Sequence, residues 1–358
     1  MKRPIGCLAA LLLAAPLVVT PALAQESRVS PIAVDSDVSV DQSVDANGNT
    51  TTGVLLDSVA SARIGPHLEA ITRPYLQRQS SGEWNWQVWV AEARYERPGR
   101  IGVRVDGGLI SSPVGYSNLL LRPHLNPTIA LPSSLFTALP TIEPGVRATL
   151  LGAVYPYGAA ATASGRHWDV RTAVIDTSPL RTRRIFAYDG DNPPEFANVV
   201  VGGGITPMVG LRIGASVTHG GWLNAGETPS TTRDRNATIV TIESEFEYRY
   251  TKFAAEWTRD ALQTSNGGTR AFGWFAQVHQ TLAPRWFVAG RVERMTSGAL
   301  TAPLTFVDQH LTGTEEVLGY RITPTITIRG GHRARRLFGR DDVGNAAEFS
   351  VVWSQRWF

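Results

Sequence analysis

The clearest pattern in the chain lies at Thr238–Tyr250, which reads TIVTIESEFEYRY. Every second position is apolar or aromatic except for one serine: Val240, Ile242, Ser244, Phe246, Tyr248 and Tyr250. The positions between them are polar and mostly charged: Thr241, Glu243, Glu245, Glu247 and Arg249. A helix would scatter the two sets around its axis, whereas a strand places one set on each face. The pattern therefore predicts a β-strand with an apolar face and a charged face.

The same alternation recurs along the chain. It is found in Lys252–Gln263, Ala271–Leu282, Arg285–Thr296, 101–106 and 168–171. In the third of these segments Phe287 stands on the polar side. The longer segments have about ten residues, the length of a tilted strand that crosses a bilayer. After residue 24 no apolar run reaches the roughly 18 residues of a transmembrane helix, so we expect any membrane crossing to be made by strands.

The connections between these segments alternate in length. Short ones carry turn signals, for example Gly65-Pro66, Arg97-Pro98-Gly99 and Thr323-Pro324. Longer, polar or irregular ones lie near residues 113–145, 179–196, 221–237 and 298–313. Short turns on one side and long loops on the other are typical of an outer-membrane barrel with periplasmic turns and extracellular loops.

Counting strands with this parity predicts an all-β protein, a transmembrane antiparallel β-barrel of about sixteen strands, with fourteen as the fallback. The first strand is expected near Val29–Val40 and the last at Glu348–Phe358. A soluble β-sandwich or propeller is the alternative fold. It is disfavoured because the chain shows no blade-length repeat.

Residues 1–24 have the pattern of a secretory signal peptide. Lys2 and Arg3 precede an apolar core, and Ala22-Leu23-Ala24 is a small-residue cleavage site before Gln25. An N-terminal membrane anchor is disfavoured because prolines interrupt the short core. We therefore expect residues 25–358 to form the barrel, in the outer membrane of a Gram-negative bacterium. Since Cys7 is the sole cysteine, the exported chain would have no disulfide, no cysteine-based zinc site and no cysteine nucleophile.

Two pieces of the chain resemble known barrels. The end, Trp353-Ser354-Gln355-Arg356-Trp357-Phe358, is similar to the terminal signal of Gram-negative outer-membrane barrels, and Gly273–Met295 resembles a strand–turn–strand hairpin of a porin. The resemblance implies the porin-type superfamily, which includes general and phosphate-selective porins, and recognition of the last strand by the barrel-assembly machinery through Phe358. Arg356 departs from the family, which usually has an aromatic or apolar residue there. Either a bulge shifts the register or the terminal Phe does not face lipid.

The polar face of each strand is expected to line the lumen. The basic candidates are Arg104, Arg171, Arg212, Arg249, Lys252, Arg291, Arg321, Arg329, Arg333 and Arg335. The acidic candidates are Asp106, Asp169, Glu243, Glu245, Glu247, Glu256 and Glu293. Arginine to carboxylate pairing across neighbouring strands would neutralise this wall. Alternatively, Arg329, Arg333 and Arg335 have too few acids nearby and make a positive wall that favours anions.

We also expect the two faces to tolerate charge differently. An added arginine should be costly at Trp274 or Phe253, on the apolar face, and mild at Thr241, on the polar face.

The segment Pro113–Gly145 is the longest connection and joins the fifth and sixth expected strands. Its apolar residues are costly to leave in water, and its six prolines restrict its shape. The porin resemblance implies that it folds into the lumen as a constriction. Packing against other loops or another subunit is the alternative. The candidate constriction residues are Leu119, Arg122, His124, Leu131 and Phe136.

Three functions follow from these observations. The first is a porin-like passive channel for small hydrophilic solutes, with an anion preference if the late arginines are unpaired. The second is an outer-membrane enzyme of phospholipase or protease type, for which no Ser-His-Asp set is visible. The third is a plugged structural or adhesive barrel. We expect the first, with no enzymatic activity.

The expected partners are outer-membrane lipid, small hydrophilic solutes and, as an open alternative, two further copies in a homotrimer. We expect no cofactor or metal, because the seven histidines lack metal spacing and Asp189-Gly190-Asp191-Asn192 lacks the later ligands of a calcium loop. We expect no nucleic acid, because the formal charge is only +3 and no basic cluster is interleaved with aromatics.

Overall fold

The computed structural model describes residues 31–78, 82–151, 155–181, 197–302 and 304–357. The expected signal peptide and its cleavage site lie outside these ranges, as do Val29, Asp189–Asn192 and the terminal Phe358. All described strands belong to one unit, Pro31–Phe358.

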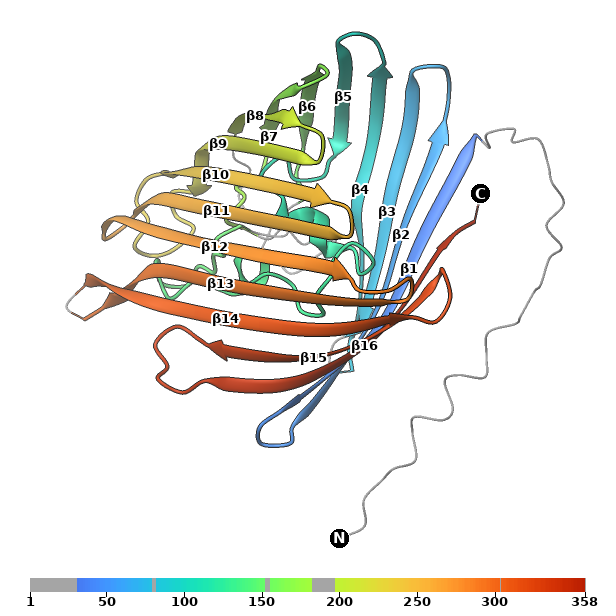
Figure 1. Cartoon of the computed structure of the whole chain (residues 1–358). Coiled ribbons are helices and arrows are strands. Elements are labelled where there is room, and N and C mark those ends of the chain that lie inside the picture. The colour runs from blue at the N-terminus through green and yellow to red at the C-terminus, as the bar shows by residue number, and fades with distance from the viewer. Residues whose placement is uncertain (1–30, 79–81, 152–154, 182–196, 303, 358) are drawn as a thin grey trace, which may run out of the picture. The chain divides into compact units, whose positions relative to one another are not determined.

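Sixteen antiparallel strands close into a single barrel, because each pairs with its sequence neighbours and β1 pairs with β16 (Figure 1). The strands are β1 (Ile32–Asp45), β2 (Thr50–Arg63), β3 (Leu68–Arg78), β4 (Trp84–Arg97), β5 (Gly102–Leu109), β6 (Tyr157–Ser164), β7 (Trp168–Ile175), β8 (Asn198–Met208), β9 (Leu211–Leu223), β10 (Arg235–Tyr248), β11 (Thr251–Thr264), β12 (Gly267–Thr281), β13 (Trp286–Thr301), β14 (Thr305–Arg321), β15 (Ile326–Arg336) and β16 (Gly344–Arg356). Two short helical turns, η1 (Ser117–Leu121) and α1 (Ser133–Phe136), lie between β5 and β6. In the described ranges we find no helix long and apolar enough to cross a membrane. The predicted fold class and strand number are confirmed.

Several expected boundaries were wrong. The first strand ends at Asp45 rather than Val40, and the last begins at Gly344 rather than Glu348. The expected loop at 298–313 is largely strand, because β13 and β14 stay paired up to Thr301 opposite Thr305. At the C-terminal end, β16 pairs with β1 through Arg356 without a register shift. Arg356 therefore does not mark a bulge in that ladder.

The two faces of the sheet are inverted relative to a water-soluble protein. In β10 the side chain of Ile242 is 48% exposed, whereas its neighbour Glu243 is 3% exposed. In β12 Trp274 is exposed and Gln277 is buried. Phe287 is buried on the inner face, where the alternation places it. Apolar side chains outside and polar ones inside are the arrangement of a membrane barrel.

The inner face is not an open, watery surface. Thr241 is fully buried and its hydroxyl bonds to that of Ser216. This burial argues against a mild effect of an arginine at Thr241, because a larger side chain would have to displace its packed neighbours.

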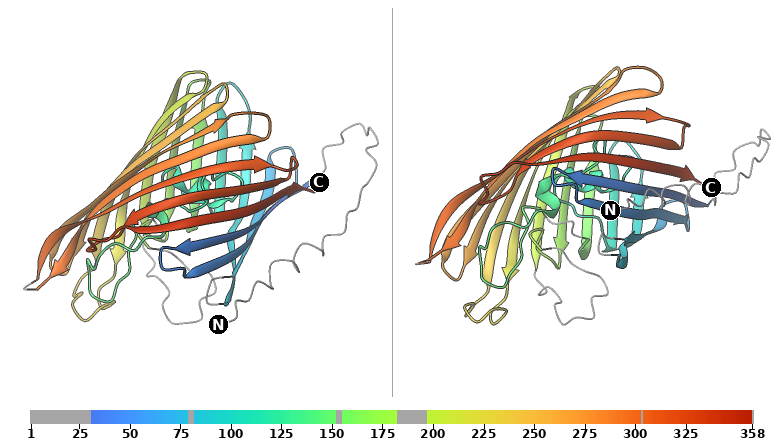
Figure 2. Two further views of the ribbon diagram at one scale, coloured as in Figure 1. Left: turned by 60° about the horizontal axis from the view of Figure 1, so that its bottom comes forward. Right: turned by 90° about the horizontal axis from the view of Figure 1, so that it is seen from below.

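The connections differ at the two ends of the barrel. One end has only short turns, such as those between β10 and β11 and between β12 and β13. The other end carries the longest connection, residues 110–156 between β5 and β6, hereafter the inner loop. Figures 1 and 2 show η1 and α1 of this loop on the inner side of the sheet. Its Leu135, Leu150 and Leu151 are fully buried in one apolar cluster with side chains of the wall, which holds the loop inside.

Candidate functional site

The inner loop is held by carboxylates that project from strands across the barrel. Glu256 of β11 accepts hydrogen bonds from the backbone N–H groups of Tyr116 and Ser117, the latter at 3.0 Å. Glu293 of β13 accepts one from the N–H of Ser133 at 2.8 Å and another from its hydroxyl. These loop donors would otherwise be buried without partners, which is costly.

A third carboxylate is shared between the loop and an arginine. Glu315 of β14 accepts hydrogen bonds from the N–H groups of Ile129, at 2.6 Å, and Ala130, at 2.9 Å. Its other oxygen accepts from Arg291 of β13 at 2.7 Å. Arg291 also donates to the Thr128 hydroxyl at 2.8 Å and to the Ala130 carbonyl at 2.9 Å. The loop backbone is therefore fixed through both its donors and its acceptors.

Two of the late arginines also hold the loop. Arg329 donates to the carbonyls of Asn126, at 2.8 Å, and Thr128, at 2.7 Å. Arg335 donates to the Ser133 hydroxyl at 2.7 Å. Arg329 and Arg335 have no carboxylate within 4.0 Å in the part of the chain that the structure describes. Their charges are met by neutral oxygens.

The loop also contacts the strand that closes the barrel. Arg122 and His124 both bond to the Asp37 carboxylate of β1, with Nε and Nδ1 at 3.0 and 2.7 Å. Leu131 is half-buried against the apolar cluster. Leu119 and Phe136 are exposed. Contacts to β1, β11, β13, β14 and β15 place the loop inside the closed sheet.

Many expected lumen residues form ion pairs with neighbouring strands. Glu243 of β10 bonds to Arg212 of β9 at 2.7 Å and to Arg171 of β7 at 3.2 Å. Arg212 also contacts Asp169 at 3.1 Å. This cluster balances two arginines with two carboxylates, so we assign it a wall-forming role.

Two further sets of ion pairs also neutralise charges on the inner face. Asp106 accepts from Arg104 of its own strand and from Arg94 of β4, both at 2.7 Å. Arg333 bonds to Glu348 of β16 at 3.0 Å. Among the three late arginines, only Arg333 thus has a carboxylate partner in the described residues.

The sequence pattern missed the position of Arg249. This residue lies in the turn after β10 with φ of 54°, and its guanidinium lies over the ring of Tyr248 at 5.1 Å from the centroid. The structure does not bring it to the inner wall. Glu247 is exposed near the same turn, and Glu245 pairs with Lys252 at 3.4 Å.

The sequence analysis also overlooked an aromatic and charged cluster beside the loop. Arg73 of β3 makes two bonds to Asp57 of β2, at 2.8 and 2.6 Å, and one to the Tyr155 hydroxyl at 3.0 Å. Trp89 stacks between Tyr75 and Tyr155, with ring centroids at 3.7 and 4.8 Å. The segment around Asp57 does not alternate, because Leu55 and Val59 share its face, so the alternation rule could not have found this cluster.

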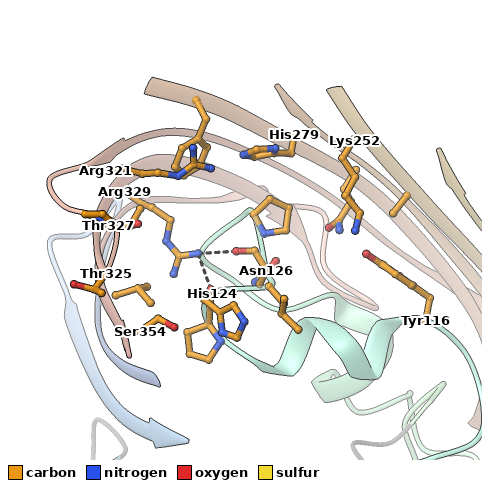
Figure 3. A pocket seen from close by; sticks show the side chains of 18 residues that line it. Tyr116, His124, Asn126, Lys252, His279, Arg321, Thr325, Thr327, Arg329 and Ser354 are labelled. Carbon is orange, nitrogen blue, oxygen red and sulfur yellow. Dashed lines mark hydrogen bonds between the residues drawn. The ribbon is translucent and has the colours of Figure 1, made fainter. Parts of the chain in front are cut away.

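A cavity of about 390 Å³ lies on the short-turn side of the inner loop (Figure 3). Loop residues Tyr116, His124 and Asn126 form one side of it, and the ends of β11, β12, β14, β15 and β16 form the other. We call this cavity the vestibule. Burial, together with the nearby Glu245 carboxylate, raises the pKa of Tyr116 above its usual range, so its phenol stays neutral.

The described residues offer little for catalysis or metal binding. Within them, no group of three or more His, Cys, Asp or Glu side chains could hold a metal ion. The bonds found for the histidines go to a carbonyl, a threonine hydroxyl or a carboxylate, and none joins one histidine to both a hydroxyl and a carboxylate. That relay is what a triad hydrolase needs.

Similarity to known proteins is found by comparing structures and not by comparing sequences. No protein-family model matches the chain, and no curated protein matches it. Among solved structures, Salmonella typhi OmpF in complex with daunomycin superimposes with a TM-score of 0.59 at 10% identity, covering 90% of this chain and 97% of that one. The in-vitro folded OmpT of Vibrio cholerae in its trimer form gives 0.57 at 10% identity, covering 90% and 99%. A further structure described as a porin gives 0.51 at 10% identity, covering 90% and 100%.

The chain has the porin-type barrel fold. The superpositions establish the fold alone, because at 10% identity the role of a residue in those proteins cannot be transferred to this chain. The vestibule of this porin-type barrel lies on the short-turn side of the inner loop, and the loop enters from the opposite end of the barrel.

Proposed function

We propose that this porin-type barrel is a passive channel for small hydrophilic solutes across a bacterial outer membrane. The observation that carries the proposal is the inverted sheet, apolar outside and charged inside, together with a polar cavity beside the inner loop. Under the proposal the apolar outer face contacts lipid. The inner loop, with Arg122, His124, Leu119, Leu131 and Phe136, narrows the lumen, so only small solutes pass.

Liposome swelling tests this function directly. Vesicles that contain the protein should swell in a disaccharide or smaller sugar and stop swelling above a size limit, because the loop occupies part of the lumen. Swelling equal to that of protein-free vesicles for every solute would contradict the proposal.

We propose further that the channel prefers anions. Arg321 and Arg329 border the vestibule and have no carboxylate within 4.0 Å among the described residues. Unbalanced arginines at the mouth of a pore raise the local anion concentration, and salt screens the effect over about 10 Å at 0.1 M. A reversal potential measured across a KCl gradient should have the sign of chloride permeation and should shrink at high salt. A potassium-selective sign would overturn the preference and leave the channel function standing.

A plugged barrel is the second candidate, because the loop bonds to strands around the barrel and buries several leucines. A plugged barrel would not conduct ions. We propose no enzymatic activity, and phospholipase or protease activity of the purified protein would contradict that. The barrel-assembly machinery stays a predicted partner through Phe358.

The comparison with the OmpT trimer form favours a homotrimer for this chain. Light scattering in a mild detergent should give three times the mass of one chain. A single-chain mass at every protein concentration would overturn the trimer.

A further inference from the structure

The vestibule has an unusual charge distribution. Its border contains three side chains that are cationic at pH 7, Lys252, Arg321 and Arg329, and two histidines, His124 and His279, all shown in Figure 3. None of the described residues that line it is an Asp or a Glu. The neighbouring acids are already engaged or lie at the rim: Asp37 bonds to His124, Glu245 pairs with Lys252, and Glu247 is exposed near His279.

Arg329 has one N–H group without a hydrogen-bond partner among the described residues. Its side chain is only 4% exposed, and its terminal nitrogens bond to loop carbonyls and to the Ser350 hydroxyl at 2.8 Å. Its Nε is buried without a partner, and so is the amide oxygen of Gln277, which also lines the vestibule. Buried polar atoms without partners are uncommon in native proteins and indicate a missing ligand or water.

Arg321 is held in position without being neutralised. Its guanidinium lies over the Phe287 ring at 5.4 Å from the centroid. The ring in turn lies against Gly319, where an added Cβ would come within 2.0 Å of it. An arginine stacked on an aromatic ring keeps its edge donors free for another group.

We propose that the vestibule binds a phosphate-type oxyanion, either inorganic phosphate or the phosphate group of a small solute. The proposal rests on the channel function, which would bring the anion to the cavity. A tetrahedral oxyanion presents acceptors in several directions, which suits arginine, lysine and hydroxyl donors around one cavity. Thr325, Thr327 and Ser354 supply the hydroxyls.

Titration calorimetry of the full-length protein in detergent with inorganic phosphate tests the site. We expect saturable binding that weakens at least about tenfold in Arg321→Gln, which corresponds to about 1.4 kcal/mol. The matched control is Arg270→Gln, which changes an exposed arginine at the far end of β12; binding should stay within about twofold. Absence of saturable binding, or equal affinity in Arg321→Gln, would overturn the site.

The outcome for the channel is separate. If phosphate does not bind while chloride conductance is normal, the oxyanion site alone is rejected. If phosphate binds but the protein does not conduct, the channel function is rejected and the site remains supported.

A different observation concerns the outer face of the barrel. Glu316 of β14 and His332 of β15 lie directly opposite each other in the ladder, and both are exposed on the outward face. A tilted strand crosses a bilayer in roughly 10 residues. Counted from the short-turn end of β14, Glu316 then lies near the middle of the bilayer. On the outward face of the described strands the other acid is Asp308, near the long-loop end of the barrel.

Most side chains around this pair are small. The small outward neighbours are Gly290, Thr314, Gly330, Ala334 and Ala347, and the large one is Leu318 of β14. On other strands the corresponding positions carry large apolar side chains such as Ile242 and Trp274, which suit lipid. A carboxylate facing lipid is destabilising, whereas small residues let a second protein surface approach closely.

We propose that a second copy of this chain covers the Glu316 and His332 face. Charge complementarity supports that occupant, because the face offers an acid beside a basic ring, and β13 and β15 carry the outward arginines Arg294 and Arg336 on either side of Thr312. A second copy can therefore meet each charge with its opposite.

Site-directed photocrosslinking tests this interface. In a Cys7→Ala background, Thr314→Cys labelled with benzophenone maleimide should give covalent adducts with two or three times the mass of one chain on illumination. Ile242→Cys, on a lipid-type surface, is the matched control and should give no such adduct. Adducts whose mass is not a whole multiple of one chain, or adducts between copies from Ile242→Cys and none from Thr314→Cys, would reject this face as the contact between copies.

Discussion

Glu315 and Ile129 are joined by a hydrogen bond of 2.6 Å although 186 residues separate them in the chain. The bond connects the wall of the barrel to the backbone of the inner loop. Glu315, Glu256 and Glu293 each accept hydrogen bonds from two donors of the loop. The position of the loop therefore depends on wall charges and on its own buried leucines.

Replacing Glu315 with glutamine should loosen the loop. The amide oxygen is a weaker acceptor than a carboxylate, and hydrogen bonds to a charged group contribute about 1.5–3 kcal/mol. We expect trypsin to cut after Arg147 at least about tenfold faster in Glu315→Gln than in the wild type. Glu247→Gln, at the exposed end of β10, is the control. If both variants are cut at the wild-type rate, the carboxylate does not hold the loop.

Gly115 makes the contact with Glu256 possible. Its φ is +74°, and an added Cβ would lie 2.6 Å from the Glu256 carboxylate oxygen. Gly145, in the same loop, has φ of +81° and open space around it. Both alanine variants carry the cost of a left-handed backbone, about 1–2 kcal/mol, and Gly115→Ala should cost about 1–3 kcal/mol more because of overpacking. Urea unfolding in lipid vesicles measures the difference, and equal losses would argue against the clash.

The barrel itself was readable from the sequence because strand alternation has a fixed period of two. Neighbours such as Ile242 and Glu243 differ strongly in polarity, so the alternation assigns them to the apolar face and the polar face of the strand. The boundaries were less predictable. The β13 and β14 hairpin extends to Thr301 with residues that resemble a loop in composition, and only pairing with the partner strand keeps them extended.

Lipid exposure should make the outer face sensitive to charge in a depth-dependent way. Ile242→Arg places a cation near the middle of β10 on the outward face and should destabilise by about 2–4 kcal/mol. Thr238→Arg lies on the same face nearer the long-loop end of the barrel, where Thr238 bonds to His219 at 2.9 Å, and should cost about 0–1 kcal/mol. Unfolding in vesicles separates the two, and equal costs would indicate that this face does not contact lipid.

The Arg73 and Asp57 pair should be unusually sensitive to single substitutions. Both side chains are buried and joined by two hydrogen bonds. Arg73→Leu leaves a buried carboxylate without its partner and should cost about 3–5 kcal/mol. Adding Asp57→Leu should restore most of that loss, because no charge then stays buried. A double variant as unstable as the single one would show that packing with Trp89 matters more than charge.

The loop contacts could not be read from the sequence. Arg329 and Arg335 alternate on one strand and lack nearby acids in the sequence, which suggested a free positive wall. In the structure they instead bond to Asn126, Thr128 and Ser133, because the loop brings its carbonyl and hydroxyl oxygens across the barrel. Such contacts span about two hundred residues, and no local pattern encodes them.

Single-channel recording in planar bilayers tests the channel function most directly. The account predicts discrete, reproducible conductance steps for the wild-type protein in KCl, and larger or noisier steps for Glu315→Gln, in which the loop is less restrained. A wild-type protein that inserts into the bilayer and shows no conductance steps, while Glu315→Gln opens a pore, would show that the inner loop is a plug and would contradict the channel.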